Sequence, residues 1–230
     1  MHIVSRVIVI FLTTFQFHYA NAWNIRQFFV PKNKNNERQQ SYELMQLLLA
    51  KDQQALDKLL LSTTEYSINN KPVSRLSIKN NVIGCWQVGA INGLPSWQKY
   101  AKILTLLKPK NIQNRNFQFF SSNGSFSNVS EYFGSDFFAF TEGTYSFQEE
   151  TQAFGSSSRL QLNATVNRIV VSVLGASFAV RVSGRGLVAV LYGDAVKRVV
   201  ESEQGVQALQ IKVPFPREYD KYPSLKIFSS

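Results

Sequence analysis

Residues 160–200 have the sequence LQLNATVNRIVVSVLGASFAVRVSGRGLVAVLYGDAVKRVV. Apolar and polar residues alternate in parts of this stretch, as in Leu160-Gln161-Leu162 and in FAVRV at residues 178–182. Successive side chains of a β-strand point to opposite faces, so this alternation predicts strands with one buried face. Gly184-Arg185-Gly186 separates two such segments and predicts a turn. The stretch therefore predicts consecutive antiparallel strands.

Strand-like segments continue on both sides of this stretch. Asn123-Gly124 predicts a two-residue hairpin with a type I′ turn, because these residues tolerate positive φ angles, and Glu142-Gly143 predicts a further turn. Many short strands joined by turns are typical of an antiparallel barrel or sandwich. The predicted strands are Ile83 to Ile91, Phe117 to Phe120, Phe126 to Val129, Phe137 to Phe140, Thr144 to Phe147, Leu160 to Val166, Ile169 to Leu174, Ser177 to Val182, Leu187 to Tyr192, Val196 to Val200 and Val206 to Val213.

Helical periodicity appears mainly before the strands. Leucines recur at helical spacing in residues 41–62, with charged residues off that stripe, which predicts one amphipathic helix that either packs on its own domain or binds a membrane. Residues 63–82 predict a linker and residues 83–213 the β-domain. Residues 97–110 predict a short helix or a loop. Residues 214–230 predict an extended tail whose aromatic side chains pack back on the β-domain.

Length and composition favour one packed globular domain. The chain has 230 residues, of which 44% are hydrophobic and 17% charged, with 18 Phe and 9 Tyr. The net charge of +10 leaves three explanations open: an anionic membrane face, nucleic acid, or plain solubility. Cys85 is the only cysteine, so the chain cannot form an intramolecular disulfide.

The N-terminus has the pattern of an export signal. Arg6 precedes a short apolar run, and Ala20-Asn21-Ala22 supplies small residues at a cleavage site, so residues 1–22 predict a signal peptide. Residues 23–40 begin with Trp23 and have no acidic residue before Glu37, which resembles a transit peptide. Together they predict the bipartite presequence of a secondary plastid. The alternative is ordinary secretion, which the glycosylation motifs at Asn123, Asn128 and Asn163 would suit.

Two segments resemble the plastid lipid-associated (fibrillin) family. Gly84-Cys85-Trp86 is similar to the Gly-x-Trp start of that family's barrel, which follows a leucine-rich helix. Gly184 to Asp194, with Arg198 and a last apolar strand over Val206 to Ile211, is similar to its C-terminal signature. The resemblance covers about residues 42–213, and Gly193, Lys197 and Glu201 depart from the usual pattern, so it is to a divergent member.

The resemblance implies a mainly β fold, an antiparallel lipocalin-like β-barrel with an N-terminal amphipathic helix. It implies a non-enzymatic structural protein that binds an apolar lipid or isoprenoid and contacts the thylakoid membrane or the lipid globules (plastoglobules) of a plastid. Candidate ligand-binding residues are Trp86, Phe119, Phe138, Tyr145 and Tyr192. Candidate structural residues are Gly84, Gly186, Asp194 and Arg198, with Asp194 expected to accept backbone N–H groups and to pair with Arg198.

The sequence offers little for catalysis. Both histidines, His2 and His18, lie in the predicted signal peptide, so the mature chain would lack a Ser-His-Asp triad and a histidine-bound metal. Glu149-Glu150 would point to opposite faces of a strand. No catalytic residue, metal or cofactor is expected. The alternative is a barrel-fold enzyme or chaperone that handles isoprenoid or bilin pigments. Nucleic acid is not expected as a partner, because the basic residues are scattered among the strands.

Overall fold

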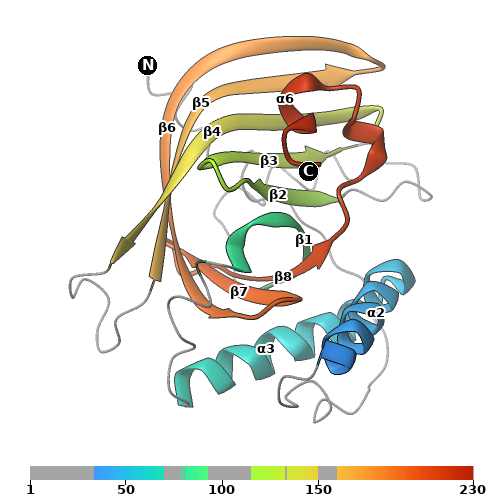
Figure 1. Cartoon of the computed structure of the whole chain (residues 1–230), viewed down its shortest axis with the longest axis vertical. Coiled ribbons are helices and arrows are strands. Elements are labelled where there is room, and N and C mark those ends of the chain that lie inside the picture. Colours follow the sequence, from blue (N-terminus) through green and yellow to red (C-terminus); the bar gives the residue numbers. More distant parts are fainter. Residues whose placement is uncertain are drawn as a thin grey trace.

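The computed structural model describes residues 34–69, 79, 81–92, 115–132, 134–149 and 160–229. Eight antiparallel strands, each paired with its neighbours in sequence order, close into a ring because β1 also pairs with β8 (Figure 1). The predicted mainly β fold and its closure are therefore confirmed. The strands are β1 (Gly84–Asn92), β2 (Asn116–Phe120), β3 (Ser125–Glu131), β4 (Phe137–Glu149), β5 (Leu160–Val173), β6 (Ala176–Gly193), β7 (Lys197–Ser202) and β8 (Gln207–Val213).

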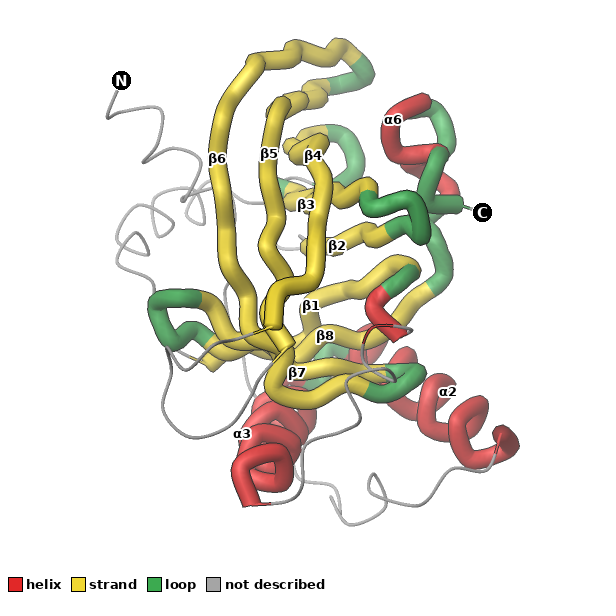
Figure 2. Tube along the Cα trace, turned by 60° about the vertical axis from the view of Figure 1, so that its left-hand side comes forward, coloured by secondary structure: helices red, strands yellow, loops and turns green. Residues whose placement is uncertain are grey.

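The ring is uneven because three neighbouring strands are much longer than the rest. β4, β5 and β6 have 13, 14 and 18 residues, whereas the other strands have 5 to 9. They extend far beyond the short strands, as the tube in Figure 2 shows. The predicted signal peptide, the part of the leader before Lys34 and the predicted short helix over residues 97–110 lie outside the described residues.

Two of the predicted turns are wrong, because glycines lie inside long strands. Glu142 and Gly143 lie within β4, where the register with β5 shifts because Asn167 of β5 forms a β-bulge and has no partner in β4. Gly184-Arg185-Gly186 lies within β6, opposite residues 164–166 of β5. A bulge keeps the pairing while adding a bend, so the interrupted alternation in the sequence did not end the strands. The predicted segments on either side of these positions, and of the bulge near residue 167, merge into β4, β5 and β6.

The predicted hairpin after β2 is present, with a different turn. Gly124 has a φ of 83°, but Asn123 has no positive φ, so the turn is not type I′. Instead the Gly124 N–H donates to the Ser121 carbonyl at 3.2 Å, and the Ser121 N–H donates to the Ser125 carbonyl at 3.1 Å. This is the pattern of a three-residue hairpin with glycine in the left-handed position.

The single predicted N-terminal helix is two helices, α2 (Lys34–Ala50) and α3 (Gln53–Asn69). Lys51, with a φ of 57°, ends α2, and the Asp52 N–H donates back to the Leu47 carbonyl at 3.1 Å. The Asp52 carboxylate then accepts the Ala55 N–H at 3.0 Å and caps α3. The leucine periodicity continues across this break, so the sequence pattern hid it. Residues 34–40 of the predicted leader and 63–69 of the predicted linker are also helical.

Both α2 and α3 pack on the outside of the ring (Figures 1 and 2). Their leucines cover the outer face of β7, β8 and the end of β1, forming one core. The C-terminal residues 214–228, called the tail below, cover the outer face of β1 to β5. Its aromatic residues pack on the ring as predicted, but the tail is not extended throughout, because it contains a 3-10 helix (Arg217–Tyr219) and α6 (Pro223–Lys226).

Candidate functional site

The interior of the ring is lined by one cluster of apolar side chains, called the inner cluster below. Every strand contributes to it, so it is the face that the ring encloses. Its buried members are Val82, Trp86, Phe120, Phe126, Leu160, Leu162, Val166, Ile169, Val190 and Val200. Seven further members remain partly exposed: Tyr145, Phe147, Ala164, Val171, Val182, Val188 and Ala208. The interior is therefore mainly apolar and is not sealed from solvent.

Only two of the candidate ligand-binding residues belong to this interior. Trp86 is fully buried in the inner cluster, and its indole N–H donates to the Val82 carbonyl at 2.7 Å. Tyr145 packs against the same cluster. Phe119 and Phe138 lie on the outer face beneath the tail, where both contact Tyr219.

The fifth candidate, Tyr192, also lies outside the inner cluster. It packs with the helices, and its ring meets Tyr66 of α3 edge-on, with the ring centroids 6.2 Å apart. Burial and the nearby Asp194 carboxylate raise the pKa of its phenol well above the ordinary value. The structure thus separates the five candidates into an inner pair and an outer three.

The sequence alone does not show which of the five candidates face the interior, because some strands are buried on both faces or carry polar residues on the inner face. In β2, Phe117 and Phe119 face the tail whereas Phe120 faces the interior. Both faces of this strand are therefore buried, and apolar residues occur on both. A barrel strand usually has its apolar residues inside, but in β8 the apolar Leu209 and Ile211 lie outside and face the helices. The residues that alternate with them, Gln210 and Lys212, face inward opposite Val88 and Trp86. The only sequence feature that indicates inward-facing polar side chains is a polar residue flanked by apolar ones, as in NFQFF at residues 116–120 and LQIKV at residues 209–213.

The turn between β6 and β7 is held by Asp194, but not with the predicted partner. One carboxylate oxygen accepts the backbone N–H groups of Val196 and Lys197 at 2.8 and 2.7 Å, as expected. The other accepts from the Lys197 ammonium and the Tyr192 hydroxyl, each at 2.8 Å. The predicted ion pair with Arg198 is wrong, because Lys197 lies on the outer face with Asp194 and the next residue points inward.

The two candidate structural glycines differ in what surrounds them. Gly84 has a φ of 124°, and a Cβ there would lie 2.8 Å from the Lys212 side chain, so this position requires glycine. Gly186 has open space around it and no positive φ. The prediction that Gly186 is structurally required therefore finds no support in its surroundings.

Arg198 lies inside the ring and is only 2% exposed. Its guanidinium is sandwiched between two aromatic rings, with its central carbon 4.4 Å from the centroid of Trp86 and 4.7 Å from that of Phe120. Its Nε donates to the Gln210 side-chain oxygen at 2.6 Å, and its Nη2 donates to that of Gln118 at 3.1 Å. Both hydrogen-bond partners are neutral amides, so the charge of Arg198 has no counter-ion among the described residues.

One nitrogen of this guanidinium has no hydrogen-bond partner in the part of the chain that the structure describes. It is Nη1, which is buried. Burial lowers the pKa of Arg198 to about 9, which still leaves the side chain protonated at pH 7. Lys212 lies nearby, with its ammonium 5.4 Å from the Trp86 centroid, and burial and the charge of Arg198 lower its pKa. The inner wall at Trp86 therefore carries two cations.

No family model, curated protein or solved structure matches this chain. In the described part of the chain, no three His, Cys, Asp or Glu side chains are grouped closely enough to hold a metal ion. None of the helices described is long and apolar enough to span a bilayer.

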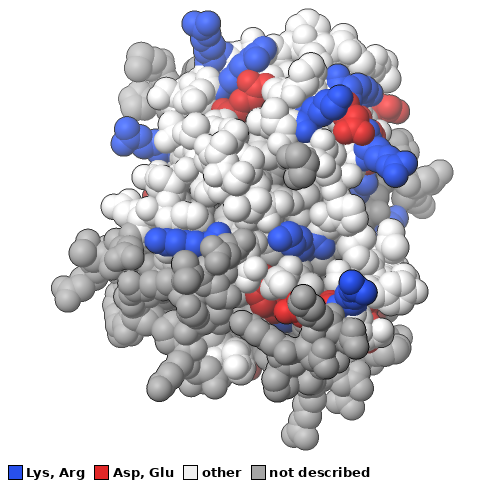
Figure 3. All heavy atoms as spheres, viewed as in Figure 1, with Lys and Arg blue, Asp and Glu red and all other residues white. Residues whose placement is uncertain are grey.

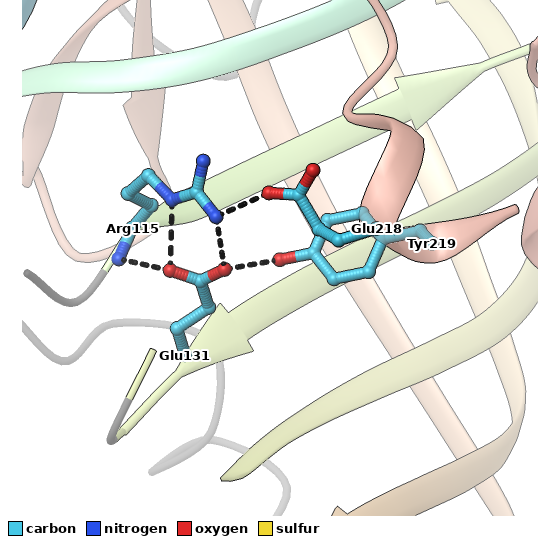
Figure 4. Close-up of polar contacts among 4 residues, drawn as sticks. All are labelled: Arg115, Glu131, Glu218 and Tyr219. Carbon is cyan, nitrogen blue, oxygen red and sulfur yellow. Dashed lines mark hydrogen bonds and ion pairs between the residues drawn. The ribbon is translucent and has the colours of Figure 1, made fainter. Parts of the chain in front are cut away.

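A second candidate site is a groove of about 620 Å³ on the outside, between α2 and the tail. Apolar residues of both elements line it, together with six polar residues, Gln87, Arg115, Glu131, Ser135, Arg217 and Glu218. The fully buried Glu131 carboxylate accepts from Nε and Nη2 of Arg115, at 2.9 and 2.7 Å, and from the Tyr219 hydroxyl at 2.5 Å (Figure 4). Arg115 also pairs with Glu218 at 2.5 Å.

This group of four residues, Arg115, Glu131, Glu218 and Tyr219, is called the tail clasp below. It joins Arg115, directly before β2, and Glu131 of β3 to the tail, and both of its carboxylates pair with the guanidinium of Arg115. Burial, followed by the charge of Glu131, raises the pKa of the Tyr219 phenol, so the hydroxyl keeps its proton and donates. Because its hydrogen bonds are satisfied, we interpret the clasp as structural. The unsatisfied Arg198 makes the ring interior the better candidate site.

Burial also explains why Cys85 is not a candidate nucleophile. The thiol packs on the outer face beneath the tail. Burial raises its pKa far above the ordinary value, although the charge of Arg198 acts in the opposite direction. The thiol therefore stays protonated at neutral pH.

Proposed function

We propose that this chain is a non-enzymatic lipid-binding protein, a divergent relative of the plastid lipid-associated family with a lipocalin-like barrel, which holds an apolar lipid or isoprenoid inside the ring. The observation that carries the proposal is the incompletely buried inner cluster. Tyr145, Phe147 and Val171 are among its partly exposed members, and the same face continues through Val180, which lies opposite Ile169 and is 58% exposed. Exposed apolar side chains on a concave inner face are typical of a site for apolar molecules.

Native mass spectrometry with lipid extraction, on the full chain purified from a lipid-containing host, tests this proposal. We expect a co-purifying lipid or isoprenoid that denaturation releases. Protein that carries no lipid, and takes up none when incubated with plastid lipid extracts, would contradict it.

We also propose that the end of the β5–β6 hairpin contacts a plastid membrane or lipid globule. Leu174, at the turn, is 83% exposed, and Val173 and Phe178 beside it are exposed as well. Arg181 and Arg185 of β6 are exposed behind this apolar end. Apolar residues that precede basic ones along a protrusion suit insertion into a lipid surface with anionic headgroups. On the face drawn in Figure 3, basic side chains are scattered and several lie beside acidic ones, which does not favour nucleic acid.

Replacing Leu174 with aspartate is expected to weaken binding to vesicles of galactolipid and anionic phospholipid by about tenfold, because the new charge opposes insertion. Flotation of the protein with the vesicles measures this. The matched control is Leu61→Asp, which places the same charge at a half-exposed leucine of α3. If both variants float like the wild type, the hairpin is not the contact.

A further inference from the structure

The buried charge of Arg198 indicates the chemical class of the ligand more specifically than the apolar side chains of the inner cluster do. A buried cation is normally stabilised by a carboxylate, or by a full set of hydrogen bonds. Arg198 has two amide acceptors and two aromatic faces, and Nη1 has none. Among the described residues, no Asp or Glu lies within ion-pair distance of it.

The surroundings of Arg198 add positive rather than negative charge. Lys212 comes from β8, two residues beyond Gln210, and shares the ring of Trp86 with Arg198. On the opposite side of Gln118, Asn128 of β3 has a buried side-chain oxygen with no hydrogen-bond partner. The amide of Asn128 turned by 180° would present its NH₂ group instead. This part of the inner wall is thus polar, incompletely satisfied and cationic.

We propose that Arg198, assisted by Lys212, binds the anionic head group of an amphipathic ligand whose apolar chain lies along the inner cluster. The head group is a carboxylate or a phosphate, since both accept charge-assisted hydrogen bonds from a guanidinium. This inference rests on the proposed function, because it requires that the ring holds a lipid.

The geometry gives each nearby group a part in this binding. The amides of Gln118 and Gln210 hold two guanidinium nitrogens, and Trp86 and Phe120 fix the guanidinium plane, which leaves Nη1 as the donor to the ligand. Tyr145 and Phe147 of β4, with Ala208 of β8, are partly exposed members of the inner cluster that an apolar chain can contact. A neutral lipid of the same length would leave Nη1 without a partner.

Displacement of the neutral fluorophore N-phenyl-1-naphthylamine from the full chain tests the proposal. The competitors are oleate, oleyl alcohol, farnesyl phosphate and farnesol, so that each acid is compared with its own neutral alcohol. We expect at least one of the anions to compete about tenfold better than its alcohol, because a charge-assisted hydrogen bond is gained. The pair that shows the preference distinguishes a carboxylate from a phosphate ligand.

In Arg198→Gln this preference is expected to fall to about one, while the alcohols still compete as in the wild type. Arg198→Lys is expected to restore part of the preference, and Arg181→Gln, which removes an exposed arginine of β6, to leave it unchanged. If Arg198→Gln does not fold, two other measurements test the proposal. They are the ratio of anion to alcohol competition in the wild type and the same ratio in Lys212→Gln, which is expected to be reduced.

The two failures are distinguishable. Equal competition by anions and alcohols in the wild type would overturn this inference and leave the proposed function standing. A chain that binds neither the fluorophore nor any competitor would overturn both.

Discussion

Replacing Gly143 with alanine is expected to lower the free energy of unfolding by about 3 kcal/mol, an effect at the upper end of overpacking substitutions. Gly143 of β4 lies beside the β-bulge at Asn167 of β5, and a Cβ there would lie 2.0 Å from the Thr165 carbonyl oxygen and 3.1 Å from the Val166 Cα. Both are backbone atoms of β5, which cannot move without breaking one of the two longest strand pairings in the ring. Urea unfolding followed by circular dichroism measures the change.

Gly186→Ala is the matched control for this substitution. Gly186 lies on β6, opposite Ala164 of the same strand β5, but has no atom within 4 Å of the position that a Cβ would take. Its stability is expected to stay within about 0.5 kcal/mol of the wild type. Equal stability of the two variants would show that β4 and β5 do not approach each other at the bulge as described.

Replacing Glu131 with alanine is expected to cost about 3 kcal/mol and to release the tail from the ring. The Glu131 side chain is fully buried and is the acceptor for Arg115 and Tyr219 (Figure 4), so its loss leaves a buried hydroxyl and a partly buried guanidinium without their partner. Limited proteolysis followed by mass spectrometry detects cleavage in residues 214–228, and urea unfolding measures the stability.

Glu218→Ala is the control, because it removes the other carboxylate that pairs with Arg115. That carboxylate is 34% exposed, so its loss is expected to cost less than about 1 kcal/mol and to leave the tail protected. If the tail of Glu131→Ala resists proteolysis as well as the tail of Glu218→Ala does, the tail clasp does not hold the tail on the ring.

The β-rich second half of the chain was predictable because alternation and turn residues act locally. The closure of the ring agrees with the expected barrel, whereas strand lengths were underestimated where a bulge broke the alternation, as at Asn167. The break between α2 and α3 could not be predicted, because there the sequence pattern continues although the helix ends. Leucines keep their helical spacing past Lys51, although Lys51 adopts a left-handed conformation there and Asp52 starts a new helix.

The candidate site was predictable only in part. Trp86 was selected for its motif, and it does lie in the interior, but Phe119, Phe138 and Tyr192 face outward because α2, α3 and the tail bury the outer face as well. Where both faces of a strand are buried, hydrophobicity no longer indicates which side is inside. The charge of Arg198 was expected at the turn with Asp194, and only the register places it beside Trp86.

The most direct test of a lipid held inside the ring is a pair of crystal structures of the full chain, one grown with oleate and one with farnesyl phosphate. We predict that in at least one of them the carboxylate or phosphate lies within hydrogen-bond distance of Arg198 Nη1 and the apolar chain lies against Tyr145 and the inner cluster. A lipid bound only in the outer groove between α2 and the tail, or a ring interior that remains without lipid at saturating concentrations of both, would contradict this prediction.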